Sequence, residues 1–141
     1  MSSAAETLGI PVISGNVSLY NETDGRGIPP TPVVGCVGIV ADVRRMPNGW
    51  NSGDVVLLAE AAGDEAGLIQ FVWRAAPHLS LAHDVSDGGL AHAVREAEQW
   101  SGREARVNET EAPHGSVVLA CDAGAVERLD WHHLGVIGVI P

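Results

Sequence analysis

Lysine is absent from this chain of 141 residues, and its eight basic residues are all arginines. A phosphate-loop lysine and a Schiff-base lysine are therefore excluded. The basic residues are outnumbered by 18 acidic residues, which gives a formal net charge of −10. Because the phosphate backbone of a nucleic acid repels a surface of this charge, we expect no nucleic-acid partner.

Cysteine and long apolar runs are also scarce. The two cysteines, Cys36 and Cys121, each stand alone in an apolar run, with no His or Cys at metal-ligand spacing. We expect both to be buried, reduced thiols of a cytoplasmic protein. No run approaches the ~20 apolar residues that cross a bilayer and no signal peptide opens the chain, so we expect no membrane contact.

What the chain does contain is a polar stretch, Ser14 to Thr23, that follows the apolar run Ile10 to Ile13. An apolar run that ends in Ser-Gly-Asn predicts a buried strand opening into a loop. Gly15 would let a ligand approach the backbone, and Asn16 and Ser18 offer polar side chains beside it. Such groups suit a phosphate and Mg²⁺, but an ordinary polar turn has the same composition.

A second stretch reads Ala-His-Asp-Val-Ser-Asp-Gly-Gly-Leu from Ala82 to Leu90. We expect a short strand over 79–83 before it. A helix should follow, because apolar residues recur at i, i+3, i+4 and i+7 (Leu90, Ala93, Val94, Ala97). A strand, a Gly-Gly turn and a helix N-terminus together form an anion site.

Two aspartates in this second stretch leave its role open. Asp84 and Asp87 would repel a bare phosphate, but they suit one that carries Mg²⁺. In the structural alternative, Asp87 caps the helix and Asp84 orients His83. We expect Ser86 or Asp87 to be the N-cap and Gly102 to end the helix.

These two stretches, with Pro-Thr-Pro-Val-Val-Gly from Pro30 to Gly35 between them, resemble phosphoribosylformylglycinamidine synthase (formylglycinamide ribonucleotide amidotransferase). The similarity is to the synthetase subunit of its multi-subunit form, in the aminoimidazole ribonucleotide synthetase superfamily. It covers residues 8–43 and 54–97, which match only the C-terminal portion of that subunit. Two long motifs in the family's order are more specific than a single glycine pattern.

The resemblance implies roles for five residues. In the first motif, Gly15 would contact nucleotide, Asn16 the metal and Ser18 the substrate. In the second motif, Asp84 would contact metal and Ser86 nucleotide. The implied cofactors are Mg²⁺ and ATP or ADP. The family's main catalytic histidine has no counterpart here, so no catalytic residue is expected.

The expected fold class is α+β, a mixed sheet with helices packed on it, like the C-terminal domain of that superfamily. This domain should span 46–141. It follows a remnant of the ATP-binding domain over 1–45, which should hold a helix at 2–8, a strand at 10–13, the signature loop and a long strand at 33–43. After Glu60 a few tens of the family's residues are expected to be missing, which removes part of the cleft lining.

Three functions remain open. In the first, the chain is part of an enzyme of purine biosynthesis that makes formylglycinamidine ribonucleotide from formylglycinamide ribonucleotide, ATP and glutamine-derived ammonia. In the second, it is a non-catalytic module that binds a nucleotide or phosphate. In the third, it is a degenerate structural or interaction protein. We expect the isolated chain to be inactive. The expected partners are a purine-pathway ribonucleotide, the missing synthetase and glutaminase subunits, and a second copy of the chain, because the strand at 33–43 lacks neighbours.

Overall fold

The computed structural model describes residues 2–17 and 21–141. The chain divides into two compact units, Met1–Ala41 and Asp42–Pro141. The division expected from the sequence, between residues 45 and 46, lies slightly further along the chain. The assignment of the two segments to two domains of the family stays a prediction.

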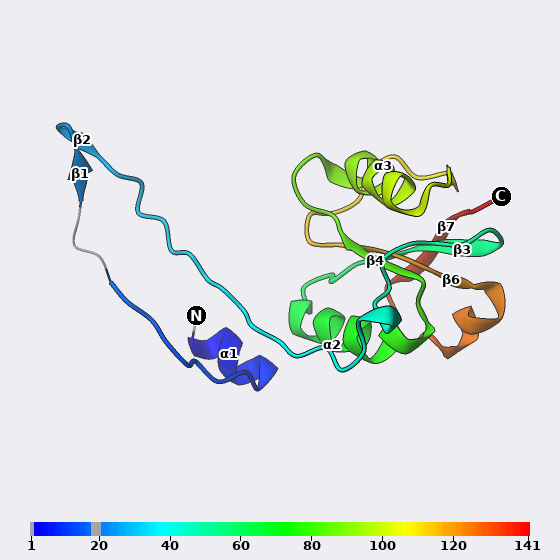
Figure 1. Cartoon of the computed structure of the whole chain (residues 1–141), viewed down its shortest axis with the longest axis horizontal. Coiled ribbons are helices and arrows are strands. Elements are labelled where there is room, and N and C mark those ends of the chain that lie inside the picture. Colours follow the sequence, from blue (N-terminus) through cyan, green and yellow to red (C-terminus); the bar gives the residue numbers. More distant parts are fainter. Residues whose placement is uncertain (1, 18–20) are drawn as a thin grey trace. The chain divides into compact units, whose positions relative to one another are not determined.

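The unit Asp42–Pro141 is built on a five-stranded antiparallel sheet with the strand order β4-β6-β3-β7-β5 (Figure 1). In chain order the strands are β3 (Asp54–Ala59), β4 (Leu81–Asp84), β5 (Arg106–Val107), β6 (Val117–Asp122) and β7 (Leu134–Val139). The central strand β3 pairs with β6 on one side and with β7 on the other. Its sequence, Asp-Val-Val-Leu-Leu-Ala, is apolar on both alternating sets, which is typical of a strand covered on both faces.

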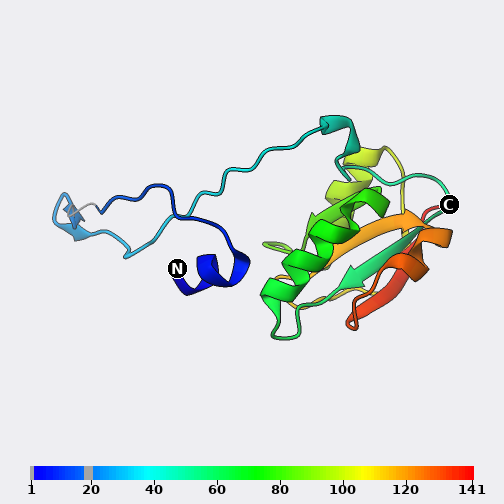
Figure 2. The same ribbon diagram turned by 90° about the horizontal axis from the view of Figure 1, so that it is seen from below.

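Helices cover both faces of this sheet. Helix α3 (Gly89–Ser101) lies on one face, and α2 (Glu65–Ala75) crosses the other together with the 3₁₀ helix η3 (Ala123–Arg128) (Figure 2). None of the described helices is long and apolar enough to cross a membrane.

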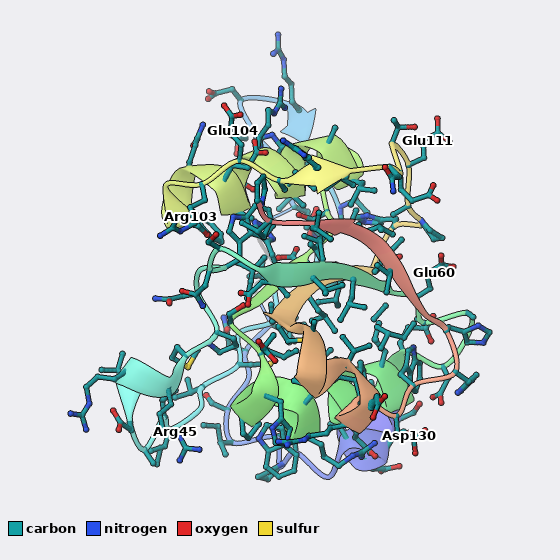
Figure 3. The ribbon with its side chains drawn as sticks, turned by 90° about the vertical axis from the view of Figure 1, so that its right-hand side faces the viewer. Arg45, Glu60, Arg103, Glu104, Glu111 and Asp130 are labelled. Carbon is teal, nitrogen blue, oxygen red and sulfur yellow. The ribbon has the colours of Figure 1, made fainter. Side chains whose placement is uncertain are left out.

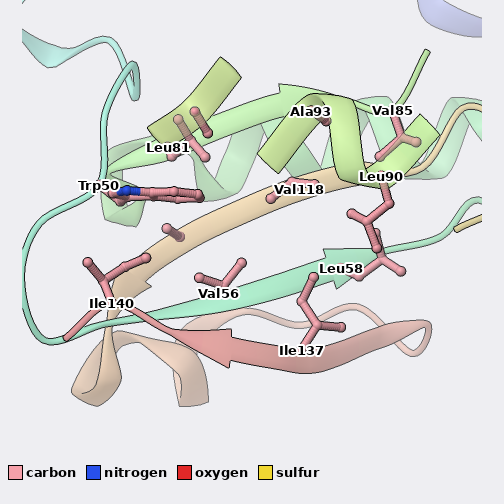
Figure 4. Packing of buried hydrophobic residues seen from close by; sticks show 12 residues of the cluster. Trp50, Val56, Leu58, Leu81, Val85, Leu90, Ala93, Val118, Ile137 and Ile140 are labelled. Atoms are coloured by element: carbon pink, nitrogen blue, oxygen red, sulfur yellow. The ribbon is translucent and has the colours of Figure 1, made fainter. Parts of the chain in front are cut away.

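Two hydrophobic clusters fill the layers between helices and sheet. The α3 side contains Trp50, Val56, Leu58, Leu81, Val85, Leu90, Ala93, Ala97, Val118, Ala120, Ile137 and Ile140 (Figure 4). The α2 side contains Leu57, Ala59, Leu68, Phe71, Ala75, Leu79, Leu119, Cys121 and Leu129. Successive residues of β3 therefore enter the two clusters in turn, because successive side chains of a strand point to opposite faces of the sheet.

The expected α+β fold is confirmed, but the mixed character of the sheet is wrong. Every pair of adjacent strands in this sheet is antiparallel. The connections between neighbouring strands return the chain in the opposite direction, and this includes the long passage from β4 through α3 and β5 to β6. The sequence showed apolar runs and helices but not the direction in which each strand re-enters the sheet.

The unit Met1–Ala41 has little regular structure. Helix α1 (Ser2–Leu8) ends before Gly9, as predicted. A two-residue turn joins β1 (Glu22–Thr23) to β2 (Arg26–Gly27) in a short hairpin. The strands predicted at 10–13 and 33–43 are wrong, since neither segment forms a strand and Val43 begins the short 3₁₀ helix η1 (Val43–Arg45). The residues of both segments are exposed to solvent, apart from the half-buried Asp42. Ile39, for example, is 99% exposed. A strand needs a neighbour for its N–H and C=O groups, and no described strand pairs with either segment.

The two cysteines differ in their surroundings. Cys121 on β6 is buried as predicted, whereas Cys36 is exposed, so the expectation of two buried thiols is wrong for Cys36. Cys36 was expected inside a strand that does not form. Burial raises the pKa of the Cys121 thiol, and the nearby carboxylates of Asp54 and Asp122 raise it further.

We therefore expect a thiol reagent to modify the native chain in two phases near neutral pH. Cys36 should react at once, and Cys121 only after unfolding, because its thiolate is both inaccessible and, with its raised pKa, scarce. The measurement is the absorbance of the released thiol anion with and without denaturant. Cys36→Ser is the control and should remove the fast phase alone, while equal rates for both thiols in the native state would contradict the buried position of Cys121.

Candidate functional site

The turn between β4 and α3 places the residues of the second sequence motif. Val85 is buried, and its N–H donates to Ser116 O at 2.8 Å while its carbonyl accepts from Gly115 N at 3.1 Å. These two bonds attach the turn to the segment that precedes β6. Ser86, the next residue, is exposed to solvent.

Helix α3 begins at this turn without a side-chain cap. Its N-cap is Gly88, in the left-handed region at φ 92°, and no side chain bonds to the first turn. The prediction of Ser86 or Asp87 as the N-cap is therefore wrong, because Gly88, in the left-handed region, lies between those side chains and the first helical residue, Gly89. Of the first-turn N–H groups, that of Gly89 donates to the main-chain oxygen of Ser86 at 3.0 Å. The N–H groups that follow it in the first turn are the donors that an anion can use. The predicted end at Gly102 is confirmed, with φ 64°.

A buried histidine fixes the end of β4 against α3. The side chain of His83 is only 8% exposed, and its Nε2 lies 3.2 Å from Glu96 Oε2. The imidazole ring stacks on Trp100, with 4.6 Å between ring centroids and 4° between planes. Its Nδ1 lies 2.8 Å from the main-chain oxygen of Asp84, closer than the 3.5 Å to the Asp84 carboxylate. Asp84 thus contacts His83 mainly through its backbone, while its carboxylate is 73% exposed.

The sequence did not identify the α3 residues that surround His83. His92, Glu96 and Trp100 recur every four residues, so they share one face of the helix. His92 Nε2 also lies 3.6 Å from Glu96 Oε2. That spacing was visible in the sequence, but the pairing with His83 depends on how α3 packs on β4.

The residues of the first motif have no comparable surroundings. Gly15 and Asn16 are exposed and irregular, and Ser18 lies outside the described residues. Gly15 and Asn16 belong to one compact unit, and Asp84 and Ser86 to the other. The four described residues predicted to bind ligand therefore do not form one site within either unit.

The oxygen atoms of the turn could hold Mg²⁺ only if a bound ligand supplies further oxygen atoms to the metal. Over residues 2–17 and 21–141, no group of three or more His, Cys, Asp or Glu side chains is placed to hold a metal ion. Protein-bound Mg²⁺ often takes one or two carboxylates and completes its shell with water and substrate phosphates. The exposed carboxylate of Asp84 suits this second arrangement.

The antiparallel sheet covered by helices and the uncapped helix start define an α+β protein with a potential anion-binding turn. No family model matches the chain. It is similar to curated proteins called phosphoribosylformylglycinamidine synthase subunit PurL. The identity is 44% to that of Thermomicrobium roseum, over 69% of this chain and 17% of the relative. The identity to the Anaeromyxobacter sp. protein is 40%, over 66% of this chain and 16% of the relative. The identity to the Nocardioides sp. protein is 36%, over 86% of this chain and 21% of the relative.

The chain belongs to the PurL family as a homologue of one portion of its members. It spans about a fifth or less of the length of these relatives. The alignment with the Nocardioides protein extends over 159 positions, more than the 141 residues of this chain. That relative therefore carries residues without a counterpart here. This agrees with an internal deletion, and its position after Glu60 stays a prediction.

Gly88 is the position where we expect the turn to be least tolerant of change. A Cβ on Gly88 would strain the left-handed backbone and would lie 2.7 Å from His92 Cβ. Gly88→Ala should lower the free energy of unfolding by roughly 1–2 kcal/mol for the backbone, with a further ~1–3 kcal/mol for the overlap. Urea denaturation followed by circular dichroism measures the loss.

Gly115→Ala is the matched control, because Gly115 also has a positive φ, 83°, but a Cβ added there would meet no other atom within 4 Å. It should show the backbone contribution alone. Equal losses for the two variants would mean that the contact between Gly88 and His92 does not constrain the turn.

Proposed function

We propose that this chain acts as a portion of phosphoribosylformylglycinamidine synthase and that the β4–α3 turn binds the phosphates of a nucleotide. The reaction proposed for the whole enzyme makes formylglycinamidine ribonucleotide from formylglycinamide ribonucleotide, ATP and glutamine-derived ammonia. Family membership supports the first part. The observation that carries the second part is the uncapped start of α3 beside the exposed side chains of Asp84 and Ser86.

Charge determines how such a site would work. A helix N-terminus favours an anion by roughly 0.3–1 kcal/mol, whereas tenfold in affinity needs about 1.4 kcal/mol. The carboxylates of Asp84 and Asp87 also oppose a bare phosphate. We therefore propose that the nucleotide binds as its Mg²⁺ complex. Asp84 would hold the metal and Ser86 would donate its hydroxyl to the nucleotide. The first-turn N–H groups of α3 that follow Gly89 would orient the phosphate.

The bound Mg²⁺ would neutralise phosphate charge, and the chain would supply no catalytic group of its own. Gly15, Asn16 and Ser18 remain our candidates for the nucleotide, metal and substrate contacts of the larger enzyme. They would act once the missing synthetase and glutaminase subunits complete the site. If no such partners exist, the β4–α3 turn favours a nucleotide-binding module without catalysis.

Self-association and a cytoplasmic location also belong to this proposal. The segment 33–43 is apolar and exposed, with Val33 and Val37 among its most exposed residues. Exposed apolar segments without strand partners recruit other chains. A second copy or a missing subunit would cover this segment.

The proposed site predicts weak, metal-dependent nucleotide binding. Calorimetric titration of the full chain with Mg·ADP should give a dissociation constant of order 1 mM, about −4 kcal/mol. Binding should disappear when EDTA removes the metal, because Asp84 and Asp87 then face uncompensated phosphates. Asp84→Asn should weaken binding severalfold or more.

Asp130→Asn removes the same charge from an exposed position after η3 and should leave the affinity unchanged. Equal binding by wild type and Asp84→Asn would place the site elsewhere. The same preparation, given ATP, ammonia and formylglycinamide ribonucleotide, should form no product, and turnover would contradict the view that the catalytic groups lie outside this chain.

A further inference from the structure

Strand β7 has an outer edge that is only partly covered. One side of β7 pairs with β3 along its length, but on the other side β5 pairs only with Gly138 and Val139. The Asn108 N–H bonds to Ile137 O at 2.8 Å and extends this cover by one residue. Residues 134–136 have no strand partner on this side among the described residues, and Val136 is 62% exposed.

The pairing of β7 with β3 shows which groups face outward on this open edge. His133 O accepts from Glu60 N, so His133 and, by alternation, Gly135 face β3. Leu134 and Val136 then direct their N–H and C=O groups away from the sheet. Two copies of this edge match each other when they run antiparallel about Gly135, because Leu134 of each then faces Val136 of the other. About four main-chain hydrogen bonds would form.

The open edge has none of the features that block edge pairing. Leu134, Gly135 and Val136 include no charge and no proline, and the bulge on β7 lies beyond them. A hollow of about 390 Å³ runs beside the edge, with the buried side chains of Leu58 and Ile137 in its lining. A strand that added here would have apolar surface to cover.

The two ends of this hollow carry complementary groups. His132 and His133 stand at the N-terminal end of β7, with ring centroids 4.4 Å apart, and Glu109 stands at the other end next to Asn108. Glu60 lies beside the histidine end (Figure 3). Antiparallel pairing about Gly135 would bring the imidazole N–H donors of one copy to the Glu109 carboxylate of the other, twice by symmetry.

We propose that two copies of this chain associate edge to edge through β7, with the two-fold axis at Gly135. The two sheets then continue into each other, and Val136 and Leu134 of opposite copies become cross-strand neighbours. The proposed interface uses no residue of the segment 33–43 and does not depend on the proposed nucleotide site. Because the paired edge is short, the contact buries less than a stable dimer needs, and the association is weak and concentration-dependent.

A single introduced cysteine tests this register. In a non-hydrogen-bonded antiparallel pair the Cα atoms are ~4.5 Å apart, within the ~4.4–6.8 Å of disulfides. A side chain at Gly135 meets nothing within 4 Å. In a Cys36→Ser background, Gly135→Cys incubated with oxidised glutathione should give a disulfide-linked dimer on a non-reducing gel. Its fraction should rise with protein concentration.

Val136→Cys in the same background is the control for random collision. Its two copies would be offset by two residues along the paired strands, ~8 Å apart and beyond the reach of a disulfide. It should cross-link several-fold less than Gly135→Cys. Equal cross-linking by both variants, or none by either in folded protein, would overturn the proposal.

Sedimentation of the chain without an introduced cysteine measures its mass at increasing concentration, and it provides a second readout if the cysteine disturbs folding. Val136→Lys places a charge on the open edge and should weaken concentration-dependent dimerisation severalfold, leaving only association through the segment 33–43. Val139→Lys places it at an exposed position of β7 that β5 already pairs, and should retain it. Dimerisation that survives Val136→Lys unchanged would overturn the proposal.

Discussion

Main-chain pairing on both sides of β3 is the constraint on which the rest of this structure depends. Six residues, Asp54–Ala59, hydrogen-bond to β6 and β7 and send alternate side chains into the two hydrophobic clusters. The start of β3 is fixed by Asp54, whose buried carboxylate accepts from Ser80 Oγ at 2.6 Å and from Asn51 N at 2.8 Å. Helices α2 and α3 pack where β3 and its neighbours present apolar side chains, and the β4–α3 turn takes its position from that packing.

The same constraint accounts for the unit Met1–Ala41. The segment 33–43 is as apolar as β3, but no strand of the described residues offers it a partner. Hydrophobic pattern shows which residues would gain from burial, whereas pairing depends on segments elsewhere.

The sequence predicted those features of the fold that depend on local pattern. The strand expected at 79–83 corresponds to β4, the helix that follows it is α3, and Gly102 marked the end of α3. It did not predict the antiparallel sheet or the failure of 33–43 to form a strand, because both depend on distant partners. It placed Asp84 and Ser86 between a strand and a helix, where the structure has the end of β4 and the turn before α3, and their roles as ligand contacts stay predictions. It missed Gly88 as the N-cap, which depends on two consecutive left-handed glycines, and the packing of His83 between Glu96 and Trp100.

The unit Asp42–Pro141 holds a sheet whose strands pair with one another, whereas residues 33–43 have the apolar sequence of a strand but pair with no described strand. Residue-resolved hydrogen–deuterium exchange, at a concentration where the chain is monomeric, tests this difference most directly. The amides of Asp54–Ala59 and Val117–Asp122 should exchange only when the whole sheet unfolds, so their protection should correspond to the free energy of global unfolding. The amides of residues 33–43 should exchange as fast as those of an unstructured peptide. Strong protection of 33–43 in the monomer, or rapid exchange across β3, would contradict this account.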